Sequence, residues 1–77
     1  MTRGLFNWKF SDVEYFLKKN GFTLKYTNAS HYYYQGIADG LIRVVCVPFH
    51  GKTVIKPRTL RGIILQSGIP KNVWFKK

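Results

Sequence analysis

The sequence predicts an α+β fold in which a small three-stranded antiparallel sheet carries helices on one face. The chain has 77 residues, which is enough for a single domain spanning residues 1–77. Segments with helical periodicity near residues 11–20 and 59–67 flank a central region, residues 22–47, whose pattern is typical of strands. The order helix, strand, strand, strand, helix lets both helices bury their apolar stripes on the same sheet face.

The first helix is predicted to begin at residue 11 or 12 and to end at about Asn20. Ser11 and Glu14 have the spacing of a capping box, and Gly21 has the position of a left-handed C-terminal cap. Three apolar residues have the i, i+3, i+4 spacing of a buried stripe: Val13, Phe16 and Leu17.

Three strands are predicted to follow this helix. Residues 22–27 alternate apolar and polar side chains, so one face of this strand is expected to be buried and the other exposed. A hairpin joins it to a second strand, residues 30–35, and residues 36–40 are expected to form a turn. The β-branched run of residues 41–47 is expected to be the middle strand and to end at Pro48.

A second helix is predicted after a loop, residues 48–56, that has a short extended piece at residues 53–55. Thr59 is the expected N-cap and Gly68 the expected C-terminal cap. The expected buried stripe is Leu60, Ile63 and Ile64. The lead-in, residues 1–10, contains three aromatic residues: Phe6, Trp8 and Phe10. We expect them to pack in the core rather than to contact a partner. In the tail, residues 70–77, Trp74 and Phe75 are expected to pack back on the domain.

Charge is the most informative bulk property. Thirteen Lys and Arg residues against three acidic residues give a formal net charge of +10, which favours a polyanionic partner: nucleic acid, an acidic membrane surface or an acidic protein. No apolar run is long enough for a membrane span, and the single cysteine, Cys46, has no internal disulfide partner. We therefore expect a cytoplasmic protein without a membrane anchor.

No metal or cofactor site is expected. The sequence lacks a zinc-binding Cys/His cluster, a phosphate-binding Gly-rich loop and a serine-nucleophile motif. The acids Asp12, Glu14 and Asp39 are assigned to helix capping and a turn, so a nuclease of this sequence would act without a metal ion. Only His31 and His50 can transfer protons near neutral pH, and residue types alone do not choose between them.

Several residues are candidates for RNA binding. Lys56, Arg58 and Arg61 cluster at the start of the second helix, Lys52 precedes them, and Lys25 is expected on the exposed face of the first strand. Tyr33 shares a strand face with His31 and could stack on an unpaired base if Tyr32 and Tyr34 face the core. Because three tyrosines in a row show no alternation, the opposite assignment stays open.

An ordered set of motifs lies between residues 11 and 69: Lys19-Asn20-Gly21-Phe22, Ser30-His31, Val47-Pro48 with His50-Gly51-Lys52, residues 56–64 (KPRTLRGII) and Gln66-Ser67-Gly68-Ile69. With this set the sequence resembles the HicA-type toxins, small mRNA-cleaving proteins of toxin–antitoxin pairs. The resemblance implies a fold like that of double-stranded RNA-binding domains, metal-independent cleavage by one histidine and neutralisation by a HicB-type antitoxin. Because this chain is basic, the antitoxin is expected to be acidic at the contact.

The resemblance assigns catalysis to His31, and Ser30 beside it is a further candidate for RNA binding. The family motif is usually Gly-Ser-His, whereas this chain has Ala29 in place of the glycine. If the family glycine serves a positive φ or a close approach of the RNA, Ala29 would cost about 1 kcal/mol or would shift the histidine, and the activity would be reduced or differently specific. The alternatives are a non-catalytic RNA-binding module of the double-stranded RNA-binding type and a subunit that docks an acidic protein.

Overall fold

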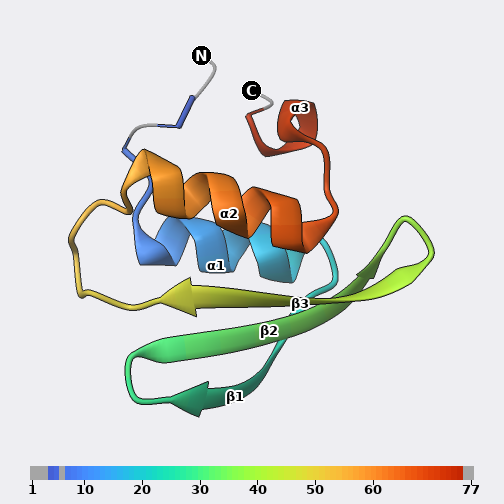
Figure 1. The fold of residues 1–77 in the computed structure, drawn as a ribbon, viewed down its shortest axis with the longest axis horizontal. Coiled ribbons are helices and arrows are strands. Elements are labelled where there is room, and N and C mark those ends of the chain that lie inside the picture. The colour runs from blue at the N-terminus through green and yellow to red at the C-terminus, as the bar shows by residue number, and fades with distance from the viewer. Residues whose placement is uncertain (1–3, 6, 76–77) are drawn as a thin grey trace.

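Two helices cover one face of a three-stranded antiparallel sheet (Figure 1). The computed structural model describes residues 4–5 and 7–75. The elements in chain order are α1 (Phe10–Lys19), β1 (Thr23–Asn28), β2 (His31–Ala38), β3 (Leu41–Pro48), α2 (Pro57–Ser67) and a short α3 (Lys71–Trp74). The predicted α+β class and the arrangement of helices and strands are confirmed.

Helix α1 begins at Phe10, earlier than predicted, because a different carboxylate caps it. The Asp12 side chain accepts a hydrogen bond of 2.9 Å from the backbone N–H of Lys9. The predicted capping box of Ser11 and Glu14 is therefore wrong. The predicted end is confirmed, because Gly21 has a φ of 89° and follows directly after the C-cap.

Helix α2 begins at Pro57, two residues before the predicted N-cap. Proline is favoured at the first helical position because its fixed φ suits a helix and its missing N–H would have no intrahelical partner there. Lys56 is the N-cap, so the prediction of Thr59 is wrong. The predicted buried stripe and the left-handed Gly68, with a φ of 70°, are confirmed.

The sheet order is β1-β2-β3, so β2 is the middle strand and β3 lies at an edge. The prediction that residues 41–47 form the middle strand is wrong, because two short hairpins place β2 between its neighbours. The predicted turn at residues 36–40 is also wrong: only Asp39 and Gly40 turn the chain, both with positive φ. Gly36 lies inside β2, where the Phe22 ring would be 2.6 Å from an added Cβ.

The core fills the space between the helices and the inner face of β2 and β3. Its fully buried members come from α1, β2, β3 and α2: Val13, Leu17, Tyr34, Val45, Val47 and Leu60. Trp8 and Trp74 are also buried and pack edge to face at 5.6 Å, and Phe16 stacks on Trp74 at 3.9 Å. Core packing by the lead-in and the tail is thus confirmed, while Phe6 lies outside the described residues.

Strand β1 is exposed along its whole length, which contradicts the predicted half-buried strand. Figure 1 shows β1 at the sheet edge farthest from α2. A β-bulge between Leu24 and Tyr26 also interrupts its pairing, so that Leu24 lies opposite Tyr34 but Tyr26 lies opposite Tyr33. Because neighbouring β2 residues point to opposite faces, the bulge moves Tyr26 to the face that does not meet the helices.

Candidate functional site

The candidate site lies on the sheet face turned away from the helices, which we call the outer face. Strand β2 directs His31, Tyr33 and Gln35 to this face, since alternate residues of a strand share a face. On the inner face, Tyr34 is fully buried and Tyr32 packs against the core. The predicted assignment of Tyr33 to the face of His31 is therefore confirmed.

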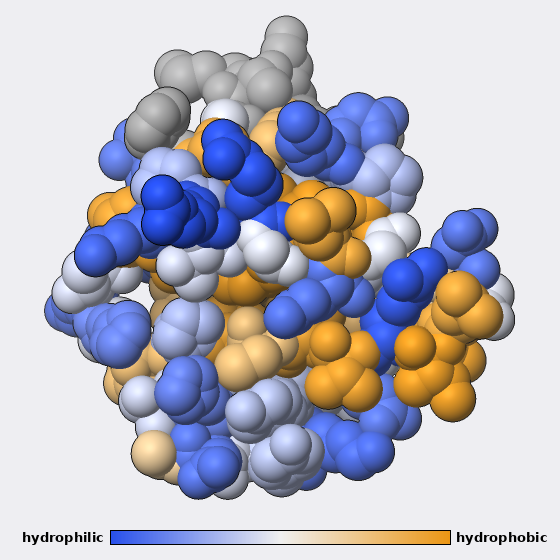
Figure 2. All heavy atoms as spheres, viewed as in Figure 1, coloured by the Kyte–Doolittle hydropathy of each residue, from blue (hydrophilic) through white to orange (hydrophobic). Residues whose placement is uncertain are grey.

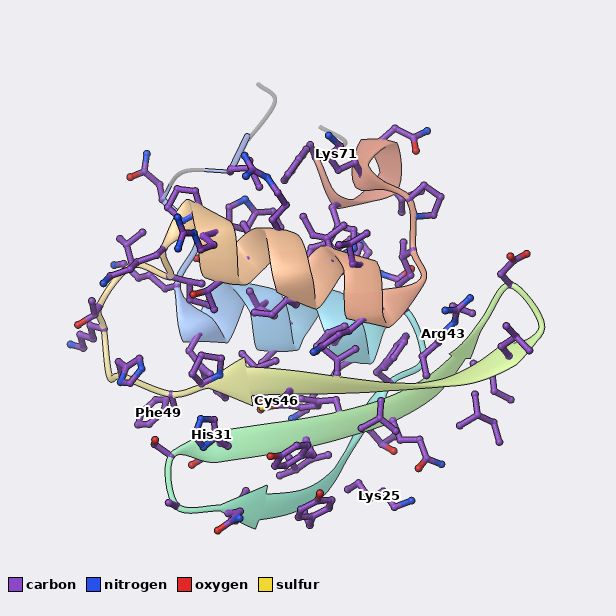
Figure 3. All side chains as sticks on the ribbon, in the orientation of Figure 1. Lys25, His31, Arg43, Cys46, Phe49 and Lys71 are labelled. Carbon is purple, nitrogen blue, oxygen red and sulfur yellow. The ribbon has the colours of Figure 1, made fainter. Side chains whose placement is uncertain are left out.

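His31 is the first residue of β2, and its side chain is exposed. It pairs with Asn28 of β1 on one side and with Pro48 of β3 on the other. The carbonyl oxygen of Ser30 accepts a hydrogen bond of 2.7 Å from the backbone N–H of Phe49, and Figure 3 shows His31 beside Phe49. The backbone is thus held from both sides, while the imidazole is open to solvent.

The loop before His31 contains a backbone conformation that is unusual for its residue. Ala29 and Ser30 form the two-residue loop between the paired residues Asn28 and His31. Ala29 has a φ of 54°, whereas Ser30 is not among the residues with positive φ. A φ in this range is sterically costly for a residue with a Cβ and is adopted freely by glycine. The expectation that the family glycine serves a positive φ therefore agrees with this backbone.

Tyr33 does not stand alone on the outer face. Its ring stacks on the ring of Tyr26, with centroids 4.5 Å apart and planes 11° from parallel. On its other side it lies opposite Cys46, and a hydrogen bond with that side chain is the main cause that raises the pKa of the Tyr33 phenol. The Lys25 ammonium donates a hydrogen bond to the Gln35 amide oxygen on the exposed surface.

Sequence reasoning missed Tyr26 as a functional candidate. The alternation of residues 22–27 places it with Phe22 and Leu24 on the inner face. The bulge at Lys25 reverses that placement. A polar residue inside an alternating strand carries no signal that distinguishes a bulge from regular pairing, so only the register between β1 and β2 identifies this side chain.

The loop after β3 and the start of α2 form an open hollow of about 220 Å³. Its lining residues are Phe10, Pro48, His50, Thr53, Val54, Ile55, Lys56 and Thr59. Pro48, which pairs with His31, forms part of the wall, so the hollow adjoins the start of β2. Of the four predicted RNA-binding cations in this region, only Lys56 lines the hollow. The other three are exposed and lie outside its lining: Lys52, Arg58 and Arg61.

Two of the acidic side chains, Asp12 and Glu14, have local structural partners. Asp12 caps α1, and the Glu14 carboxylate accepts a hydrogen bond from the Tyr34 hydroxyl and lies 3.6 Å from the Lys18 ammonium. Asp39 lies in the hairpin turn. Within residues 4–5 and 7–75, no three His, Cys, Asp or Glu side chains are grouped as metal ligands would be, and no helix is long and apolar enough to cross a membrane.

Comparison with known proteins gives one family match. No curated protein and no solved structure matches the chain significantly. The sequence model of the HicA toxins of bacterial toxin–antitoxin systems matches residues 10–69, which include α1, the whole sheet and α2. The match covers most of the chain and includes the hairpin that carries His31. The chain therefore belongs to the HicA toxin family, the mRNA interferases of toxin–antitoxin systems.

Proposed function

We propose that this protein cleaves mRNA with His31 as its general base and without a metal ion. The observation that carries the proposal is the position of His31: an exposed imidazole at the start of the middle strand, on a backbone fixed by pairing to both neighbouring strands. A proton acceptor must be open to its substrate and held in a defined place, and this position meets both needs.

The proposed reaction is an attack within the RNA backbone. The His31 imidazole removes the proton of a ribose 2′-hydroxyl, and the 2′-oxygen forms a bond to the adjacent phosphorus atom. The bond from phosphorus to the 5′-oxygen breaks, and the leaving oxygen takes a proton from a water molecule. The hydroxide that remains takes the proton from the protonated His31 and returns the imidazole to its neutral form. The products carry a cyclic 2′,3′-phosphate and a 5′-hydroxyl. DNA lacks the 2′-hydroxyl and is not cleaved.

The basic side chains are assigned to RNA binding in this proposal. The phosphates are attracted by four cations: Lys52, Lys56, Arg58 and Arg61. Lys56 lines the same hollow as Pro48, and Pro48 pairs with His31 at the start of β2. Positive charge near the scissile phosphate also stabilises the negative charge that develops in the transition state. General base catalysis contributes about 10²- to 10⁴-fold, so one histidine supports a modest rate.

The antitoxin is proposed to be of the HicB type and acidic where it meets this chain. The net charge of +10 supports this proposal, because opposite charge on the partner would speed association and favour the complex. Both partners and the mRNA substrate would meet in the cytoplasm.

The test is a cleavage assay on single-stranded RNA in the presence of EDTA, with purified parent, His31→Ala and His50→Ala proteins. His50 is the matched control, because it is the other histidine and is also exposed. We expect the parent and His50→Ala to produce cyclic phosphate ends and His31→Ala to produce none. Loss of parent activity on chelation would refute metal independence, and equal activity in His31→Ala would refute the role of His31.

The same assay separates the alternative function. If both parent and His31→Ala bind RNA and neither cleaves it, the protein is an RNA-binding module or a toxin inactivated at Ala29. The variant Ala29→Gly decides between the two, because it restores the usual family residue without touching the histidine. Cleavage by Ala29→Gly alone would identify an inactivated toxin.

A further inference from the structure

We propose that the stacked pair Tyr26–Tyr33 is a binding platform for an unpaired base of the RNA substrate, with Tyr26 as the residue that contacts the base. This inference rests on the proposed function and specifies its substrate as single-stranded RNA. Tyr26 can take this role because the β-bulge turns its side chain to the outer face, which also carries His31.

The first argument is that the Tyr26 ring is open. Its side chain is 51% exposed and does not belong to the hydrophobic core. One side of the ring is covered by Tyr33, and β1 is the edge strand of the sheet, so no strand of residues 4–5 and 7–75 stands beyond its other side. Every nucleobase has a flat π-face that can stack on such a ring.

The second argument is that the platform is already ordered. The two rings are nearly parallel at 4.5 Å, and Tyr33 is held in turn between Tyr26 and Cys46. A base that stacks on Tyr26 therefore extends an existing stack, and little side-chain entropy remains to be lost on binding. The Tyr33 ring is neutral at physiological pH, because its contact with the Cys46 side chain raises the pKa of the phenol above its ordinary alkaline value.

The third argument is the shared face. Tyr33 and His31 are two residues apart on the same face of β2, which corresponds to about 7 Å. The Tyr26 ring lies beside Tyr33 on the β1 side, so a base on its open side lies farther from His31 than Tyr33 does. In this proposal the RNA strand runs from that base across the outer face to the His31 imidazole.

The fourth argument is charge. Lys25 lies directly before Tyr26 and its ammonium is held by the neutral amide of Gln35, a contact that leaves the positive charge in place. A cation beside an exposed aromatic pair is the combination that single-stranded nucleic-acid sites use, with the cation on the backbone and the ring on the base. A duplex hides its base faces within its own stack, so it gains nothing from Tyr26.

The experiment measures binding separately from cleavage. All variants are made in the His31→Ala protein, so that the RNA stays intact, and the probes are a labelled oligoadenylate and the same strand annealed to oligouridylate. We expect Tyr26→Ala to weaken binding of the single strand by about 5- to 150-fold, the range of one base–aromatic stack. Tyr26→Phe keeps the ring and is expected to bind like the parent, as is Tyr15→Ala, a control on α1 with a 68% exposed tyrosine.

Two further readouts make the test specific. Duplex binding is expected to be unchanged in Tyr26→Ala. The salt dependence of single-strand binding is also expected to keep its slope, because no phosphate contact is removed, whereas Lys25→Ala lowers that slope by about one phosphate contact. Circular dichroism verifies that each variant folds, which the exposure of Tyr26 favours.

The proposal is overturned if Tyr26→Ala binds the single strand as tightly as Tyr15→Ala does, or if it loses affinity equally for the duplex. It is also overturned if Tyr26→Ala binds RNA normally but no longer binds the antitoxin, since the pair would then be a protein interface. None of these results affects the cleavage test, because the parent protein can cleave RNA whether or not Tyr26 contacts a base.

Discussion

Replacing Ala29 by glycine is expected to stabilise the protein, although glycine destabilises most ordered positions. Ala29 has a φ of 54°, and a left-handed conformation costs an L-residue about 1–2 kcal/mol that glycine does not pay. Glycine in turn gains more freedom in the unfolded chain, which offsets about 0.4–1 kcal/mol of the benefit. The Ala29 methyl group is exposed, so its removal leaves no cavity.

The difference between the midpoints of these ranges predicts that Ala29→Gly is about 0.8 kcal/mol more stable than the parent. For a domain of this size, that gain corresponds to a rise in Tm of about 3–6 °C. Urea unfolding followed by circular dichroism measures the change, and an unchanged m-value verifies that both proteins unfold in the same way.

Ala38→Gly provides the matched control, because it is the same chemical change beside the other hairpin. Ala38 ends β2, packs against the core and is not among the residues with positive φ. Glycine there is expected to destabilise the protein by about 0.5–1 kcal/mol. Opposite signs for the two variants support the strain at Ala29. If Ala29→Gly destabilises the protein as much as Ala38→Gly does, the reasoning is refuted.

Two further predictions concern buried polar groups. Ser67→Ala removes the hydroxyl oxygen that accepts hydrogen bonds from the Ile69 N–H and the Trp74 indole N–H, and it is expected to cost about 1–3 kcal/mol in urea unfolding; a loss below about 0.5 kcal/mol would contradict this role. Burial first, and the hydrogen bond to Glu14 second, raise the pKa of the Tyr34 phenol above the ordinary value of 10.0. Because the unfolded chain then releases this proton first, the contribution of Tyr34 to stability does not change with pH below about pH 10. Above that pH the contribution falls as the pH rises. Unfolding measured against alkaline pH should show a shallower decline in Tyr34→Phe, and identical declines would refute the assignment.

Patterns that involve one segment and one buried face were predictable from the sequence. The apolar stripes of α1 and α2 lie in the core as the i, i+3, i+4 spacing predicts, and both helices end before a glycine with positive φ. These features depend on helical geometry and on the conformational freedom of glycine, which act within a few residues. The N-caps were predicted less well, because several side chains near each start can compete for the same free N–H groups.

Patterns that depend on pairing between segments were not predictable in the same way. The β-branched content of residues 41–47 suggests a central strand, yet the hairpins place β2 in the middle. The alternation of residues 22–27 suggests a half-buried strand, yet the helices leave β1 exposed. Strand order and burial depend on what lies beside a segment in space, which no local pattern contains.

The same division applies to the candidate site. The residues alone show the basic charge, the two available histidines, the family motif around His31 and the positions where the helices end. In contrast, the stacking of Tyr26 on Tyr33 and the positive φ of Ala29 become visible only in the folded chain. For Tyr26 the cause is the bulge, because one extra residue in a strand reverses the face of every later side chain. The register that reveals the bulge exists only between two paired strands.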